Sequence, residues 1–201
     1  MSSSCARIGR TCALALLAAA GCGADDGSAT TADDGAAATD AAIDAPPIVG
    51  EPPGLVGTTA AHNAARAQVG VGPLTWDPAL AAIAAAWAAQ CHDTDAPIGL
   101  IDHNPGRSNG YPTYVGENIY GSGGGASGTD AVALWISEQA HYDHATNTCA
   151  GGAICGHYTQ VVWRATTKVG CALHDCPGLQ YGSSVVCDYG PGGNIGGQAP
   201  Y

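Results

Sequence analysis

The sequence GHYTQVVWRAT occupies residues 156–166. From His157 to Trp163 we predict a β-strand near the end of the chain. Because side chains alternate between the two faces of a strand, His157 shares a face with Val161 and Trp163 and is predicted to point inward. Spacing alone leaves two interpretations of this histidine, which are a hydrogen-bonded residue of the core and part of a binding site.

Upstream of this stretch, apolar residues repeat at the spacing of helices. Asp77 can cap a helix with Pro78 in its first position, and the apolar stripe of that helix runs from Leu80 to Cys91, which should face the core. Three helices are predicted, at residues 58–69 with Thr58 or Thr59 as the cap, at residues 78–91, and from Thr129 onward. The predicted strands are residues 115–120, 157–163, 169–174 and 181–189. Residues 93–113 and 121–128 are predicted to be loops. This order predicts an α+β fold, with helices packed on a small antiparallel sheet.

Two further polar residues lie on helix faces that should be apolar. Glu138 follows Leu134 by four residues and Trp135 by three, so it falls on the predicted buried stripe of the third helix. A buried carboxylate requires a cation, a metal ion or hydrogen-bond donors to offset its desolvation. On the first helix, His62 aligns with apolar positions such as Ala65. The spacing by itself favours a frayed stripe end for Glu138 and hydrogen-bonded core histidines over a shared His/Glu site.

Composition and the N-terminus indicate a secreted protein. Six basic and seventeen acidic residues give the 201-residue chain a formal charge of −11, which argues against binding to nucleic acid phosphates. Nine cysteines are too many for a routine cytosolic protein of this size. Residues 1–21 carry two positive charges, at Arg7 and Arg10, followed by an apolar run at residues 12–20. This run is shorter than the about 20 residues that a helix needs to span a membrane. The combination is typical of a secretory signal peptide.

Cys22 is predicted to carry a lipid. Small residues precede it, as at the cleavage site of a bacterial lipoprotein, and this prediction assumes a bacterial source. Lipidation leaves six cysteines in the rest of the mature chain, enough for three disulfides, whereas the alternative is ordinary secretion with Cys22 as a stray thiol. Residues 22–54 are predicted to form a flexible acidic tether of Ala, Asp, Thr and Gly. The protein should then be secreted or held at the cell envelope, and should meet the membrane only through its lipid.

Six motifs are spread over residues 55–201. They are HNAAR at 62–66, LTWD at 74–77, GENI at 116–119, LWISE at 134–138, GHYTQVVWRAT at 156–166 and GNIGGQAPY at 193–201. Together they resemble the CAP superfamily, which comprises the cysteine-rich secretory, antigen 5 and pathogenesis-related class 1 proteins. The resemblance covers the whole of residues 55–201, which are taken as one CAP (SCP) domain. Asp188 departs from the pattern, because the family usually has Asn after Cys187.

The resemblance implies a three-layer α-β-α sandwich with a central cleft. Two histidines and two glutamates line that cleft in the family, and they are carried over to His62, Glu117, Glu138 and His157. The resemblance also implies the disulfides Cys91–Cys176, Cys149–Cys155 and Cys171–Cys187. Because imidazole suits Zn²⁺, His62 and His157 are predicted to hold a divalent metal ion, with the two glutamates as hydrogen-bond partners or water-mediated ligands. The remaining histidines, His92, His103, His141, His144 and His174, are predicted to be solvated loop residues, with His141 and His144 as an alternative ligand pair.

The preferred function is a non-enzymatic binding module, because members of the family resemble modules that bind sterols, fatty acids or other partners. A lipid, a sterol or an extracellular protein is the expected ligand. The alternative is a metal-dependent hydrolase that uses the His/Glu cleft, with a glutamate as the base of a metal-bound water. No HExxH motif supports this alternative, and no domain cysteine remains free as a nucleophile. A purely structural envelope protein is the third hypothesis.

Overall fold

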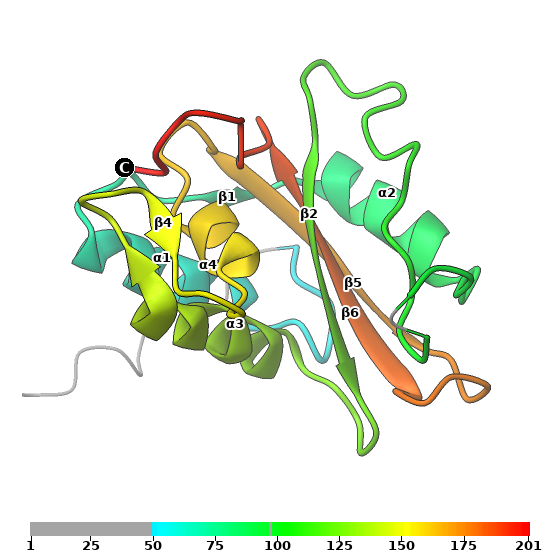
Figure 1. Cartoon of the computed structure of the whole chain (residues 1–201). Helices are drawn as coiled ribbons and strands as arrows, with labels where there is room; N and C mark the ends of the chain where they lie inside the picture. Colours follow the sequence, from blue (N-terminus) through cyan, green and yellow to red (C-terminus); the bar gives the residue numbers. More distant parts are fainter. Residues whose placement is uncertain (1–49, 97) are drawn as a thin grey trace, which may run out of the picture. The chain divides into compact units, whose positions relative to one another are not determined.

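A computed structural model describes residues 50–96 and 98–201, so the predicted signal peptide, Cys22 and most of the predicted tether lie outside the described residues. A four-stranded sheet forms the middle of the domain, in the order β1-β5-β6-β2 (Figure 1). Its strands are β1 (Thr75–Trp76), β2 (Gly116–Ser122), β5 (Lys168–Asp175) and β6 (Ser183–Gly190). β6 pairs antiparallel with both β2 and β5, and β1 pairs parallel with β5. The strands predicted at 115–120, 169–174 and 181–189 are therefore confirmed.

Helices cover both faces of this sheet. α2 (Pro78–Ala88) packs against β5 and β6 on one face, whereas α1 (Thr58–Gln68), α3 (Gly128–Ser137) and α4 (Gly156–Val161) contact one another on the opposite face (Figure 1). The 3₁₀ helix η1 (Glu138–His141) continues α3 and leads into a small hairpin of β3 (Tyr142–Asp143) and β4 (Thr148–Cys149). The predicted α+β, three-layer architecture is confirmed. Within the described residues, no helix is both long enough and apolar enough to cross a membrane.

The second helix begins as its sequence predicts. The Asp77 side chain accepts hydrogen bonds from the backbone N–H groups of Ala79 and Leu80, and Pro78 occupies the first helical position. Gly170 in β5 lets the helix approach the sheet closely, because a Cβ atom there would lie 2.2 Å from the backbone nitrogen of Ala81. The helix ends at Ala88, so Cys91 lies beyond it, half-buried, rather than on the helical stripe.

The first helix is capped differently from the prediction. Gly57, in the left-handed region at φ 90°, is the N-cap residue instead of Thr58 or Thr59. The Glu51 carboxylate accepts the backbone N–H groups of Gly57 and Thr59, at 2.7 and 2.6 Å. A carboxylate at this position satisfies N–H groups that the helix leaves unpaired and also favours the positive end of the helix dipole. Glu51, predicted to belong to the flexible tether, is therefore packed against the domain.

The signature at residues 156–166 begins as a helix, so the predicted strand from His157 to Trp163 is wrong. Tyr158, Val161 and Val162 are buried at positions i, i+3 and i+4, which is a helical spacing. Gln160 is also buried, because its side-chain oxygen accepts the backbone N–H of Gly193 at 2.8 Å. A tertiary contact therefore buries a polar residue and hides the helical pattern from sequence inspection.

Arg66 fixes the end of this short helix. Its guanidinium is buried and donates hydrogen bonds to the backbone carbonyls of Val161, Trp163 and Thr166, at 2.8–2.9 Å. The last carbonyls of a helix have no partner inside the helix, and a cation there also complements the negative end of the dipole. Arg66 thus ties α1 to the C-terminal end of α4.

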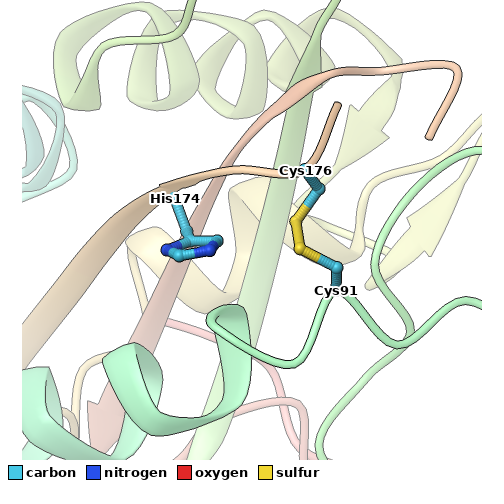
Figure 2. Close-up of side chains that lie close together, drawn as sticks. All are labelled: Cys91, His174 and Cys176. Atoms are coloured by element: carbon cyan, nitrogen blue, oxygen red, sulfur yellow. A yellow bond between two sulfur atoms is a disulfide. The ribbon is translucent and has the colours of Figure 1, made fainter. Parts of the chain in front are cut away.

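Three disulfides cross-link the domain, and all three predicted pairs are confirmed. They are Cys91–Cys176, Cys149–Cys155 and Cys171–Cys187, with sequence separations of 85, 6 and 16. The first joins the segment after α2 to the segment after β5 (Figure 2). It closes by far the longest loop of the three, so the chain-entropy account assigns it the largest stabilisation.

Candidate functional site

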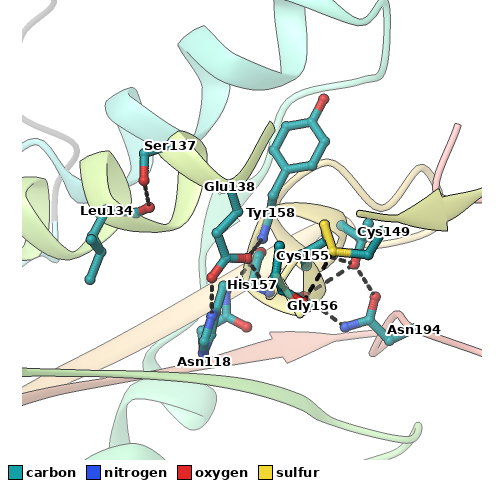
Figure 3. Close-up of polar contacts among 12 residues, drawn as sticks. Asn118, Leu134, Ser137, Glu138, Cys149, Cys155, Gly156, His157, Tyr158 and Asn194 are labelled. Atoms are coloured by element: carbon teal, nitrogen blue, oxygen red, sulfur yellow. Dashed lines mark hydrogen bonds and ion pairs between the residues drawn. A yellow bond between two sulfur atoms is a disulfide. The ribbon is translucent and has the colours of Figure 1, made fainter. Parts of the chain in front are cut away.

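Glu138 and His157 form a tight pair at the junction of α3 and α4 (Figure 3). The Oε1 atom of Glu138 lies 2.6 Å from Nδ1 of His157, and its Oε2 atom accepts the backbone N–H groups of His157 and Tyr158 at 3.0 and 3.1 Å. Burial raises the pKa of Glu138, but the hydrogen bonds from His157 and Tyr158 outweigh it and hold that pKa below its usual value. Glu138 therefore lies at the end of the helix and is partly buried, and hydrogen-bond donors offset the desolvation of its carboxylate.

A second pair has the same geometry but comes from a loop and a strand. Nδ1 of His103 lies 2.6 Å from Oε1 of Glu117, and the same oxygen accepts the backbone N–H of Asn104 at 2.9 Å. The Glu117 side chain is fully buried, whereas that of His103 is 60% exposed. Arg107 fixes the loop by donating to the carbonyls of Asn104 and Val115. His103, predicted to be a solvated loop residue, is thus anchored to one of the predicted site glutamates.

The two pairs meet at one cavity of about 450 Å³. His103 and His157 both line it, and its apolar wall consists of Leu100, Ile101, Ile119 and Ile154. In each pair the Nδ1–H group donates to a carboxylate, so Nε2 of each imidazole remains the acceptor. The cleft therefore combines an aliphatic wall with two histidines whose tautomer and orientation are fixed by glutamates.

His62 is not part of this cleft. It is completely buried, with Nδ1 2.8 Å from the carbonyl of Thr58 and Nε2 2.8 Å from the hydroxyl of Tyr189. Burial lowers the pKa of His62 to about 4, so it is neutral at physiological pH. The ring of Trp135 contacts that of His62 at a tilt and stacks on that of His157, with 6.2 Å between ring centroids in both cases. The prediction that His62 and His157 together hold a metal ion is therefore wrong, and His62 is the hydrogen-bonded core histidine of the alternative interpretation.

Neither His141 nor His144, the alternative ligand pair, is among the residues that line this cleft. His144 stacks on the ring of Tyr201, and its Nε2 atom lies within hydrogen-bond distance of the carbonyl oxygen of Tyr201. His141 is exposed at the end of η1. Across residues 50–96 and 98–201, neither histidine belongs to a group of three or more side chains able to share a metal ion.

Asp188 adds a buried carboxyl group behind the cleft. It lies directly opposite Glu117 in the β2–β6 pair and is completely buried. Among the described residues, its two oxygens and Oε2 of Glu117 have no hydrogen-bond partner. Burial first, and the carboxylate of Glu117 second, raise the pKa of Asp188 to about 8, although Arg107 opposes this. The residue at which the sequence departs from the family pattern is therefore protonated at neutral pH.

The model of the cysteine-rich secretory protein (CAP) family matches residues 59–189. The chain belongs to this family. Its CAP domain is 46% identical to tobacco (Nicotiana tabacum) pathogenesis-related protein 1B over 142 residues, which cover 70% of this chain and 77% of that protein. Pathogenesis-related protein 1 of Arabidopsis thaliana is 45% identical over 141 residues, covering 70% of this chain and 78% of that protein.

Solved structures of CAP proteins share the fold of this domain. Venom allergen-like protein 4 of Schistosoma mansoni matches with a TM-score of 0.55 and 25% identity, covering 75% of this chain and 94% of that one. The crystal structure of NaASP2 with Zn²⁺ matches with a TM-score of 0.54 and 26% identity, covering 72% and 82%. Membership of a secretory family supports the secretion predicted from residues 1–21.

Of the four residues predicted to line the cleft, Glu117, Glu138 and His157 lie together here with His103, whereas His62 lies in the core. No signal in the sequence identified His103, because it lies in a loop, at residues 98–113, without the periodicity that marks buried faces. His62 lies in a strongly helical stretch, where its alignment with buried positions is explained by its place in the core.

Proposed function

We propose that this CAP domain is a secreted binding module whose cleft captures a lipid or sterol. The observation that supports this function is the cavity itself, whose volume of about 450 Å³ falls in the usual range for ligand sites. Four aliphatic side chains provide burial for an apolar ligand, and two histidines at the same cavity can orient a polar head by hydrogen bonding.

We further propose that His103 and His157 hold a divalent metal ion in the cleft. The donor set fits Zn²⁺, because a zinc-binding histidine commonly donates its other ring N–H to a carboxylate, as both of these do. The crystal structure of the related NaASP2 with Zn²⁺ adds support from the family. A bound Zn²⁺ would supply a positive charge and a Lewis acid at the polar end of the cleft. The chain contributes two oriented imidazoles and, through Glu117 and Glu138, their fixed tautomers.

The geometry supports a binding module better than a hydrolase. A hydrolase of the kind considered above needs a glutamate with a free oxygen that can accept a proton from water in the cleft. Both Glu138 oxygens accept hydrogen bonds from His157 or its neighbour, and the Glu117 side chain is fully buried behind His103. Oε2 of Glu117 has no hydrogen-bond partner among the described residues, but it is buried, so neither glutamate presents a free oxygen to water in the cleft.

Replacing Ile154 with serine should weaken lipid capture about tenfold. Ile154 lines the cavity but is 64% exposed in the free protein, so its loss removes a ligand contact without opening the core. Burying one aliphatic side chain contributes about 1.5 kcal/mol, which corresponds to about one order of magnitude in Kd. Leu134→Ser is the matched control, because Leu134 is similarly exposed, at 54%, but is not among the residues that line the cavity.

The measurement is the binding of a fluorescent fatty acid and of tritiated cholesterol to wild type and both variants. We expect saturable binding of at least one probe, weakened by Ile154→Ser and changed less than twofold by Leu134→Ser. Equal affinities in all three proteins would place the lipid outside the cleft. Capture of an extracellular protein without either lipid, or hydrolysis of an ester probe that depends on Glu117, would contradict the proposal and favour the other hypotheses.

A further inference from the structure

The disulfide between Cys91 and Cys176 has a histidine beside it. His174 projects from β5 toward the two sulfur atoms (Figure 2). One nitrogen of His174 and the two sulfur atoms all lie within 4.8 Å of one another. No other group of three or more metal-ligating side chains occurs in the described part of the chain. His174 was predicted to be a solvated loop residue, but it is half-buried in the penultimate position of a strand.

We propose that reduction of the Cys91–Cys176 disulfide creates a zinc site made of Cys91, His174 and Cys176. In the disulfide neither sulfur is a thiolate, and the thiolate is the form that binds metal. A dithiol reductant would donate two electrons to the sulfur–sulfur bond and two protons to the sulfurs, leaving as its own disulfide. Zn²⁺ would then displace the two thiol protons and bind two thiolates and one neutral imidazole, with water in the fourth position.

The distances suit this ligand set. Tetrahedral zinc has Zn–S bonds of about 2.3 Å and Zn–N bonds of about 2.0–2.1 Å, which place ligand atoms about 3.5–3.8 Å apart. Once the covalent bond is broken, side-chain rotation about Cα atoms that are 5.6 Å apart can bring the sulfurs to this separation. Two soft thiolates and an imidazole favour Zn²⁺ over Mg²⁺ or Ca²⁺, which prefer oxygen ligands.

The surroundings of the three disulfides make this pair distinct. Cys171 and Cys187 are 2% and 0% exposed, so a reductant reaches them poorly. In the Cys91–Cys176 pair, Cys176 is 1% exposed but Cys91 is only half-buried, so a reductant can attack the Cys91 sulfur. Cys149 is exposed, but its pair with Cys155 has no third ligand nearby among the described residues. Zinc bound by Cys91 and Cys176 would replace the covalent link between the end of α2 and the end of β5 by bonds to the metal ion. It would thus hold α2 on the sheet under reducing conditions.

The test is a metal titration of the reduced full chain, with Cys5, Cys12 and Cys22 replaced by serine to remove their thiols. A phosphine reduces the protein, taking oxygen from water as it becomes the phosphine oxide, and is removed anaerobically. Mass spectrometry after alkylation identifies the free thiols. Co²⁺ then serves as the probe, read by its thiolate charge-transfer absorption, and Zn²⁺ is added to displace it.

Reduced protein should bind one Co²⁺ per chain with this absorption, and oxidised protein should show none. His174→Ala should weaken Co²⁺ binding by at least about tenfold. Removing a residue that only hydrogen-bonds to a metal ligand already lowers metal affinity by about that factor, and His174 would be a ligand itself. His141→Ala, which removes an exposed histidine elsewhere, should leave binding unchanged. Zn²⁺ should also raise the melting temperature of the reduced parent protein, which is the chain that carries only the three serine replacements. The rise should be much smaller for the His174→Ala variant of this parent protein.

Equal Co²⁺ affinity in the parent and His174→Ala proteins would overturn the proposal, as would retention of the charge-transfer absorption after Cys91→Ser and Cys176→Ser together. Circular dichroism shows whether the reduced chain remains folded. A reduced chain that stays unfolded with metal present, and binds Co²⁺ equally in every variant, would also overturn it, because the site requires α2 and β5 to be in place.

Discussion

Replacing both Cys91 and Cys176 with alanine is expected to lower the free energy of unfolding by about 4–5 kcal/mol. This disulfide has a sequence separation of 85, and the chain-entropy relation assigns a loop of that length about 4.6 kcal/mol. Cys176 is also 1% exposed and belongs to the apolar cluster between α2 and the sheet, together with Ala84, Ala88 and Val186. Losing the cross-link should therefore loosen the packing of α2 as well as widen the unfolded ensemble.

Cys149→Ala with Cys155→Ala is the matched control. Its sequence separation of 6 gives about 2 kcal/mol by the same relation, and the pair joins a hairpin to the start of α4 rather than two layers of the fold. Chemical denaturation of both double variants under oxidising conditions measures the difference. Equal losses would contradict the assignment of the largest stabilisation to the bridge between α2 and β5.

Asp188→Asn should stabilise the protein by about 2–4 kcal/mol at pH 7. The pKa of Asp188 is about 8 in the folded chain, against 3.8 for an ordinary aspartate, so the folded state keeps a proton that the unfolded state releases. Stability therefore falls as pH rises from about 4 to about 8, by up to about 1.4 kcal/mol for each pH unit. Asparagine does not ionise, and its amide can donate to Oε2 of Glu117, which has no partner among the described residues.

The pH dependence separates this cause from a general packing effect. The difference in unfolding free energy between Asp188→Asn and wild type should be small near pH 4 and grow up to about pH 8. Asp175→Asn, at an exposed aspartate at the end of β5, is the control and should change stability little at any pH. A difference that is constant from pH 4 to pH 8 would show that Asp188 is not protonated in the folded protein.

The fold could be predicted where local signals agree with tertiary packing. Asp77 and Pro78 define the start of α2, and turn residues bound β5 and β6. Prediction failed where tertiary contacts override the local pattern. Gln160 is buried through its bond to Gly193, which obscured the helix α4. Leu134, predicted to lie on the buried stripe of α3, is 54% exposed, and Val132 is buried instead.

The residues of the candidate site that lie in sequence motifs could be predicted. Glu117, Glu138 and His157 lie in contiguous motifs that match the family, and the structure places each beside a histidine or a glutamate of the cleft. His103 lies in a loop whose position depends on hydrogen bonds from the Arg107 guanidinium to the carbonyl of Val115 and from the backbone N–H of Asn104 to the Glu117 carboxylate. A histidine that reaches the cleft through such a loop has no periodic signal, whereas His62 has a strong one because it belongs to the core.

We propose that His103 and His157 act together in the cleft, whereas His62 remains a residue of the core. The most direct measurement is a Zn²⁺ titration of the oxidised protein at about pH 7.5, monitored through the NMR signals of the imidazole Cε1–H groups. The His141→Ala variant identifies the signal of His141, which serves as the solvent-exposed reference. We predict that the His103 and His157 signals change together and saturate at one Zn²⁺ per chain, while the signal of buried His62 stays in place. Zn²⁺-dependent change at His62, or no change at His103 and His157, would contradict the account.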